Sequence, residues 1–267
     1  MRHENYVQKK IQQVAIFDDQ PNARESLAEI VEDAHLTPIV QDEPIVSLEA
    51  CIETVQTSGS AAIFDNHLSQ RNYANFRGIL AVKSLYLLCI PALLVTTYFY
   101  SDISEIREYL PYTPAIITPD ELNSDMIIKG FEICQNEFAG KFSPERKPWR
   151  SLVRVEEIKD EKSVYVVIPS WNASEKILLP ISIFPIQDEK IEGMRFFAQV
   201  NIGAESYSDL YCYNIESEIN LKQQVISQKS GADMAKQTFS ERWKGQFKLS
   251  NNSDDSRLDY LKQRYQL

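Results

Sequence analysis

The chain has 267 residues, of which 43% are hydrophobic and 25% are charged, and its formal net charge at pH 7 is −10. This length allows two domains of ordinary size, and the hydrophobic content is that of a globular protein with a buried core. The acidic balance argues against nonspecific DNA binding, because lysine and arginine must neutralise the phosphates in such complexes.

Short apolar runs alternate with helical patterns over the first half of the chain. Predicted strands lie at residues 14–17, 38–40, 61–64, 93–95 and 115–117, and predicted helices lie between them, the last beginning at about Ser124. Ser101 and Asp102 are good N-cap residues for a helix through Ile103, Ile106 and Leu110. This alternation predicts a doubly wound parallel sheet of five strands.

Polar residues stand where three of these strands end. Asp18 and Asp19 follow the first strand, Asp65 follows the third, and Thr96 follows the fourth. The carboxyl ends of parallel strands gather at one edge of a sheet, where ligands bind. Crowded carboxylates raise the pKa of their neighbours, and Mg2+ relieves this repulsion by binding one or two carboxylates, water and phosphate oxygens. The pattern therefore predicts a site that accepts a phosphoryl group.

Residues 10–140 resemble the receiver domain of two-component response regulators. Asp18 and Asp19 match its acidic pair, Asp65 matches its phosphoacceptor and Thr96 matches its hydroxyl residue. The resemblance implies a flavodoxin-like fold, Mg2+ held by Asp18, Asp19 and Asp65, and an acyl phosphate on Asp65. Thr96 would donate a hydrogen bond to a phosphoryl oxygen, and a sensor histidine kinase would supply the phosphate. No enzymatic activity is implied beyond self-phosphorylation from a phosphodonor.

Two positions depart from the pattern of that family. A receiver carries a lysine at the end of its fifth strand, just before a proline, whereas this chain has Thr118 before Pro119. The aromatic switch residue expected three positions earlier is replaced by Ala115. These departures leave open a phosphate-independent pseudo-receiver that acts as a scaffold or assembly subunit.

The second half of the chain has a different periodicity. A charged segment with two prolines, 141–148, predicts a stiff linker between residues 1–140 and a β-rich domain over residues 149–216. That domain contains five strand candidates, at 151–159, 162–169, 176–183, 193–201 and 207–216, with turns at 159–162 and 201–205. They predict a small all-β barrel or sandwich. The tail, 217–267, is polar and has short helical patterns.

The β-rich domain is rich in aromatic residues, which favours core packing over stacking of nucleic-acid bases. Because no helix-turn-helix, catalytic triad, P-loop or zinc motif occurs there, we expect a protein-interaction output. Binding of nucleic acid or a small ligand by this domain is a third, weaker hypothesis. The run Tyr98–Phe99–Tyr100 also favours packing over a partner surface, and residues 101–117 could form a homodimer face.

Cysteines and histidines give no sign of a metal centre. The cysteines form no CxxC pair and are expected to be buried thiols in a reducing compartment, and the histidines lack metal-ligand spacing. The N-terminus is polar and lacks an apolar signal segment, and the most apolar stretch contains Lys83 and Pro91. We therefore expect a cytoplasmic protein without a membrane span. The cysteines are Cys51, Cys89, Cys134 and Cys212, and the histidines are His3, His35 and His67, the last of which lies two positions after Asp65.

Overall fold

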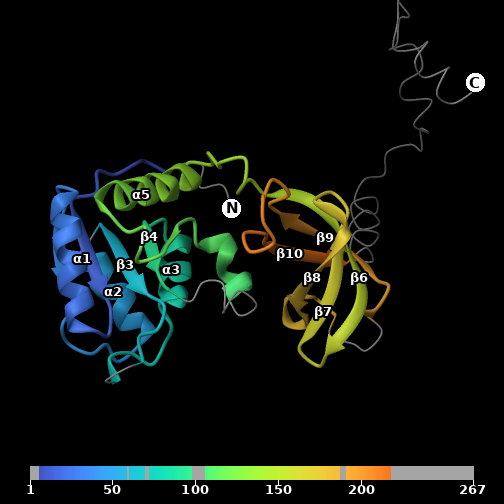
Figure 1. Ribbon diagram of the computed structural model, residues 1–267, viewed down its shortest axis with the longest axis horizontal. Helices are drawn as coiled ribbons and strands as arrows, with labels where there is room; N and C mark the ends of the chain where they lie inside the picture. Colours follow the sequence, from blue (N-terminus) through green and yellow to red (C-terminus); the bar gives the residue numbers. More distant parts are fainter. Residues whose placement is uncertain (1–5, 59, 70–71, 98–105, 187–190, 218–267) are drawn as a thin grey trace, which may run out of the picture. The chain divides into compact units, whose positions relative to one another are not determined.

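A five-stranded parallel sheet forms the first half of the computed structural model, which describes residues 6–58, 60–69, 72–97, 106–186 and 191–217 (Figure 1). The strand order is β2-β1-β3-β4-β5, and each neighbouring pair is parallel. This order is that of flavodoxin-like doubly wound folds, so the predicted fold class is confirmed. The strands are β1 (Gln13–Phe17), β2 (Thr37–Val40), β3 (Ala61–Asp65), β4 (Ala92–Val95) and β5 (Ile116–Ile117).

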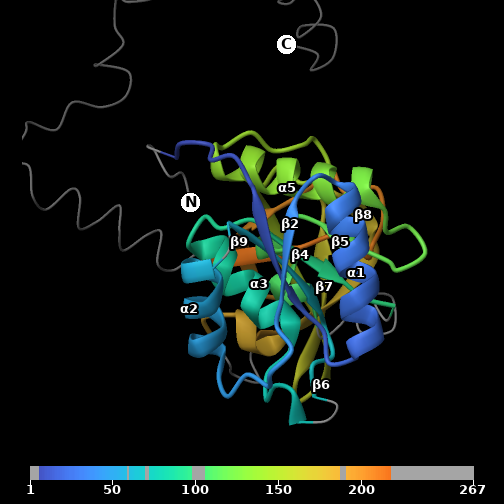
Figure 2. The same ribbon diagram turned by 90° about the vertical axis from the view of Figure 1, so that its left-hand side faces the viewer.

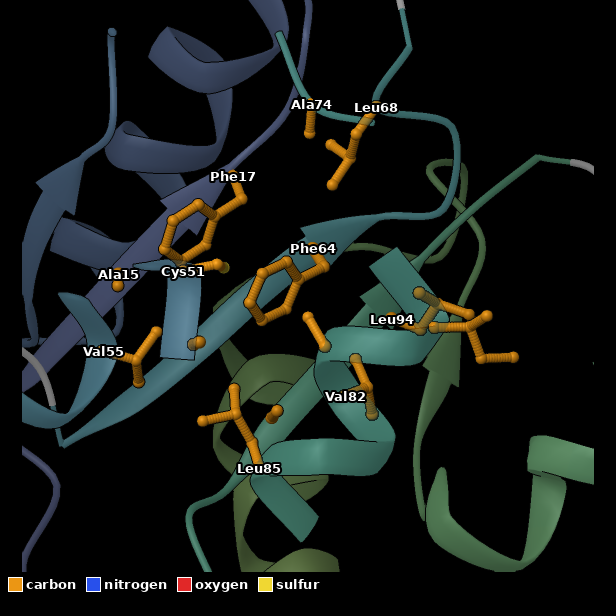
Figure 3. Close-up of a cluster of buried hydrophobic side chains, with 14 of the residues drawn as sticks. Ala15, Phe17, Cys51, Val55, Phe64, Leu68, Ala74, Val82, Leu85 and Leu94 are labelled. Atoms are coloured by element: carbon orange, nitrogen blue, oxygen red, sulfur yellow. The ribbon is translucent and has the colours of Figure 1, made fainter. Parts of the chain in front are cut away.

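Helices cover both faces of this sheet, which explains why its strands are continuously apolar. Alternate residues of each strand point to opposite faces, so Val14 and Ile16 pack under α1 and α5, whereas Ala15 and Phe17 pack under α2 and α3 (Figure 2). On the second face, the rings of Phe17 and Phe64 stack with centroids 4.5 Å apart (Figure 3). The helices are α1 (Pro21–Asp33), α2 (Leu48–Ser58), α3 (Gly78–Leu87) and α5 (Ser124–Phe138).

The segment before β5 differs from the predicted α-helix. Ser101, Asp102 and Ile103 lie outside the described residues, as does the aromatic run 98–100. From Arg107 to Tyr112 the backbone forms the 3-10 helix η2, which contains Pro111. Proline lacks the N–H of an α-helical hydrogen bond and clashes with the preceding turn, so a full α-helix is disfavoured here.

The second half forms an antiparallel sheet with its own hydrophobic core. Its order is β10-β9-β6-β7-β8, and the five predicted strand regions are confirmed with shifted bounds. Among the described residues this is one sheet, with β10 and β8 at its edges. Its strands are β6 (Trp149–Asp160), β7 (Ser163–Ile168), β8 (Asn172–Pro180), β9 (Arg195–Val200) and β10 (Cys212–Ser217), and the 3-10 helix η3 (Ile181–Ile183) follows β8.

Several aromatic side chains of the second half pack against its core, as the sequence predicts. The rings of Phe184 and Phe196 meet edge to face within the core, with centroids 5.1 Å apart. Trp171 is half-buried and its Nε1 donates to the carbonyl oxygen of Ala204 at 2.8 Å. These three side chains therefore serve packing, and none is available as an open stacking platform.

A buried ion pair holds the predicted linker against α5. The carboxylate of Glu137 is buried, and Arg146 Nε donates to its Oε1 at 2.5 Å. The Tyr86 hydroxyl donates to Glu137 Oε2 at 3.1 Å, and the Tyr211 hydroxyl donates to the carbonyl oxygen of Arg146. We call Glu137, Arg146, Tyr86 and Tyr211 the joint, because they link residues of α3, α5, the linker and the segment before β10.

A second arginine ties η2 to the loop before β10. Arg107 is 2% exposed, and its Nη1 donates to the carbonyl oxygens of Tyr207 at 2.9 Å and Leu210 at 2.5 Å. Its guanidinium carbon lies 4.2 Å from the centre of the Tyr207 ring. Burial lowers the pKa of Arg107, and the negative charge of Asp209 acts in the opposite direction.

The remaining sequence predictions concern the ends of the chain and a membrane span. No helix in the part of the chain that the structure describes is long and apolar enough to cross a membrane. The predicted tail lies outside the described residues, apart from Ser217 at the end of β10.

Candidate functional site

The predicted acidic residues meet at the carboxyl edge of the first sheet. Phe17 pairs with Phe64 across β1 and β3, so Asp18 and Asp65 follow these strands side by side. Asp65 in turn pairs with Val95 of β4, and Thr96 is the next residue. The sheet register therefore brings Asp18, Asp19, Asp65 and Thr96 to one edge, which we call the acidic end.

The acidic end is largely removed from solvent. Asp18 is 8% exposed, Asp19 and Thr96 are each 2% exposed, and Asp65 is partly buried. The backbone N–H of Gln20 donates to Asp18 Oδ1 at 2.7 Å, and that of His67 donates to Asp65 Oδ2 at 2.9 Å. These bonds favour the charged form of each carboxylate and fix its orientation.

Burial nevertheless dominates the titration of these carboxyl groups. The pKa of Asp65 is raised to about 6, first by burial and then by the negative charge of Asp18, against the hydrogen bonds that lower it. Burial also raises the pKa of Asp18, and the charge of Asp19 acts in the same direction. The acidic end thus holds more negative charge than its surroundings stabilise, which is typical of functional sites.

The donor chemistry of the acidic end fits a hard divalent cation. Mg2+ is bound by one or two carboxylates, with water and phosphate oxygens completing its shell. Within the described ranges, no three histidine, cysteine, aspartate or glutamate side chains are grouped closely enough to hold a metal ion by themselves. The predicted ligands are Asp18, Asp19 and Asp65. One or two of them would contact the ion, and water or phosphate oxygens would be its other ligands.

Arg24 is a charged neighbour of the acidic end that the sequence patterns did not predict. It lies on α1 and is 5% exposed, and its Nη1 donates to the carbonyl oxygen of Asp18 at 2.6 Å. Its Nε lies 3.3 Å from Asp42 Oδ1, and its guanidinium lies 5.3 Å from the centre of the Tyr73 ring. Its charge lowers the pKa of Asp18, less strongly than burial raises it.

The helical spacing of α1 contained a signal for Arg24. The buried residues of α1 are Arg24, Leu27 and Val31. An arginine three and seven positions before buried aliphatic residues lies on the same helix face. Such a residue is rarely buried unless its charge has partners, so its position was informative.

The loop after β3 adds apolar side chains to the core that contains Phe17 and Phe64. Ile45, in the loop after β2, donates its N–H to the carbonyl oxygen of Tyr73 at 2.7 Å, and Ile45 and Ala74 form a parallel bridge. Leu68 and Ala74 lie beside the stacked Phe17 and Phe64 in Figure 3. The loop thereby extends the apolar core at the residues that directly precede Asp18 and Asp65.

A glycine lets α3 begin directly against Asp65. A Cβ atom on Gly78 would lie 1.9 Å from the carbonyl oxygen of Asp65, which no side chain can tolerate. The N–H of Gly78 donates to the carbonyl oxygen of Asn66 at 3.0 Å. Gly78 therefore fixes the backbone on which the Asp65 side chain is presented.

The end of β5 contributes a hydroxyl where the receiver pattern has a lysine. Thr118 Oγ1 donates to Glu121 Oε2 at 3.0 Å, so this side chain is engaged with the following turn. Ala115, at the position of the aromatic switch residue, is buried. β5 thus supplies no positive charge here, whereas Arg24, on α1, supplies one near Asp18.

Comparisons with known proteins found similar solved structures for about half of this chain. No family model and no curated protein matches this chain. Similar solved structures include FixJ-N (TM-score 0.37, 18% identity, covering 48% of this chain and 96% of that one). Others are the anti-anti-sigma factor PhyR from Bartonella quintana (0.37, 20%, 50% and 50%) and the chemotaxis response regulator CheY4 of Vibrio cholerae (0.35, 14%, 47% and 99%). At these values the likeness says nothing of residue roles, and the fold assignment rests on the strand order.

Proposed function

We propose that this chain is an atypical response regulator, in which Asp65 accepts a phosphoryl group and residues 149–216 form a protein-interaction output. The observation that carries the proposal is the position of Asp65 beside Asp18 at the ends of neighbouring strands. Burial raises the pKa of both carboxyl groups, the charge of Asp18 raises that of Asp65 further, and the charge of Asp19 raises that of Asp18. A nucleophile in an excess of negative charge is suited to a reaction that brings in a cation and a phosphoryl group.

The reaction requires one bond to form and one to break at phosphorus. A carboxylate oxygen of Asp65 attacks the phosphorus of a donor such as acetyl phosphate, and the bond to acetate breaks with its electron pair leaving on acetate. Mg2+ would be held by one or two of Asp18, Asp19 and Asp65 together with water, and it would neutralise charge on the phosphoryl oxygens. The N–H of His67 holds Asp65 Oδ2 in place, and the Thr96 hydroxyl would donate to a phosphoryl oxygen. We place the protein in the cytoplasm, where a sensor histidine kinase would be the phosphoryl donor.

The alternative is a pseudo-receiver that docks partners without phosphate. The observation that favours it is the end of β5, where Thr118 is hydrogen-bonded to Glu121 and supplies no cation. A receiver without that charge has a weaker link between a phosphoryl group and the segment after Thr96. In this case the acidic end would be a structural remnant, and substitution of Asp65 would leave partner binding unchanged.

Phosphorylation of the purified full-length protein separates the two functions. With acetyl phosphate and Mg2+, we expect a slower band on a phosphate-retarding gel, which EDTA and Asp65→Asn both remove. Asp120→Asn changes an exposed carboxylate beyond β5 and should keep the band. A folded wild-type protein that gives no band, or a band that survives Asp65→Asn, would contradict phosphoacceptance at Asp65.

A further inference from the structure

The two edges of the first sheet present different backbone groups. In β2, the N–H groups of Thr37 and Gln41 donate to β1, so the groups of the alternate residues Pro38 and Val40 face outward. Proline has no N–H, so Pro38 removes one outward donor from this edge. Proline on an edge strand is one means by which proteins prevent pairing with another strand.

The opposite edge, β5, keeps its outward donor and acceptor. The carbonyl oxygens of Ala115 and Ile117 accept from Leu94 and Thr96 of β4, so the N–H and C=O of Ile116 face away from the sheet. No other backbone hydrogen bond to Ile116 occurs among the described residues. This edge can therefore pair with one further extended strand.

A groove of about 410 Å3 runs along this open edge. Residues 113–118 line it on one side, and the half-buried side chains of Met126 and Ile133 on α5 supply apolar contacts. The linker and the loop between β9 and β10 close it, through residues that include Asn201 and Arg146. An apolar groove beside an unpaired strand edge is the arrangement that accepts a peptide by strand addition.

The charges of the groove indicate the chemistry of its occupant. Four carboxylates line it, whereas its two cations are Lys129 and Arg146, and Arg146 is already ion-paired with Glu137. The side chains of the four carboxylates are exposed, so they can reach a bound peptide without prior desolvation. They belong to Glu121, Glu145, Glu205 and Asp209.

We infer that this groove binds an extended peptide of a partner protein that carries a lysine or arginine. The peptide pairs with the N–H and C=O of Ile116, places its apolar side chains against α5, and sets its cation near Glu205 and Asp209. At about 3.3 Å per residue, the lining from 113 to 118 accommodates roughly four to six residues of peptide. This interaction is independent of phosphate, so it holds or fails separately from the proposed function.

A selected peptide tests the inference on the full-length protein. A random decapeptide display library is panned against the protein, and a synthetic copy of an enriched peptide is titrated by fluorescence anisotropy. We expect enriched peptides to contain lysine or arginine, and Ile116→Pro to weaken binding about tenfold, which is the effect of one lost hydrogen bond. Val40→Pro is the matched control, because it removes an outward N–H from the other edge, and it should change affinity less than about twofold.

Two readouts keep the test decisive if Ile116→Pro perturbs folding. Peptide addition to the wild-type protein should slow hydrogen exchange at the Ile116 amide and leave the Val40 amide unchanged. Glu205→Lys should weaken binding severalfold at low salt. The inference is overturned if no peptide is enriched, if the Ile116 amide gains no protection, or if the wild-type protein instead self-associates through this edge in a way that Ile116→Pro abolishes.

Discussion

The acidic end and the joint both bury carboxylates, but they treat the charge in opposite ways. In the joint, the carboxylate of Glu137 is 3% exposed and receives donors from both Arg146 and Tyr86. At the acidic end, burial and the charge of Asp18 raise the pKa of Asp65, and burial and the charge of Asp19 raise that of Asp18. Arg24 directs its side chain to a main-chain oxygen and to Asp42. Stability alone favours the arrangement of the joint, and the arrangement of the acidic end is consistent with the cation site that we propose.

The largest expected effect comes from breaking the joint. Arg146→Met leaves Glu137 buried without its ion-pair partner, and breaking a buried pair in this way lowers the free energy of unfolding by about 3–5 kcal/mol. Urea denaturation of the full-length protein, followed by tryptophan fluorescence, measures this loss. The retained hydrogen bond from Tyr86 is too weak to replace a full positive charge.

A second variant distinguishes the unpaired charge from lost packing. Glu137→Gln combined with Arg146→Met removes both charges, and it should recover more than half of the stability that Arg146→Met loses. Equal losses in the single and double variants would show that the joint acts through the packing of Arg146 on Tyr211, rather than through its charge.

The acidic end should respond to charge removal with the opposite sign. In EDTA at pH 7, Asp65→Asn removes a carboxylate that burial and Asp18 destabilise, so we expect the unfolding free energy to rise by about 1 kcal/mol. The folded-state pKa of about 6 lies above the ordinary 3.8, so the wild-type protein loses stability as the pH rises from about 4 to 6, and the loss is complete above pH 6. The gain should therefore vanish as the pH falls to about 4, where the carboxyl is protonated in the folded protein.

Thermal unfolding at several pH values checks this sign. Asp120→Asn, at an exposed carboxylate, should leave the melting temperature unchanged throughout. A loss of stability in Asp65→Asn at pH 7 would mean that the bond from the His67 N–H to the carboxylate outweighs its repulsion from Asp18.

The first sheet is well predicted by its sequence because both faces of its strands are buried. Continuous apolar runs such as 61–64 have a single interpretation when helical patterns alternate with them, and the polar residue after each run marks its carboxyl end. The sequence alone therefore places Asp65 and Thr96 at one edge. The direction of charged side chains such as Arg24 cannot be predicted in this way, because a helical pattern specifies a face and not a partner.

The joint escapes prediction for a related reason. The segment 141–148 has the composition of a linker, yet Arg146 within it pairs with Glu137 nine residues earlier. Composition reports that a segment is polar and proline-rich, but burial of one of its charges depends on residues from other elements, here Tyr86 and Tyr211. The 3-10 helix η2 is similar, since Pro111 predicts an interruption but not the insertion of Arg107 beside Tyr207.

The smallest expected effect concerns the single arginine of α1 beside Asp18. Arg24 lowers the pKa of that carboxyl, so its charge competes with a cation bound there. Arg24→Gln keeps a donor for the Asp18 carbonyl oxygen and should tighten Mg2+ binding about threefold, measured by isothermal titration calorimetry. Lys147→Gln removes an exposed cation that lies over Trp149, and it should leave Mg2+ affinity unchanged. Weaker Mg2+ binding in Arg24→Gln would instead show that Arg24 positions the turn after β1. The disordering of the ligands around Mg2+ would then outweigh the removal of a competing positive charge.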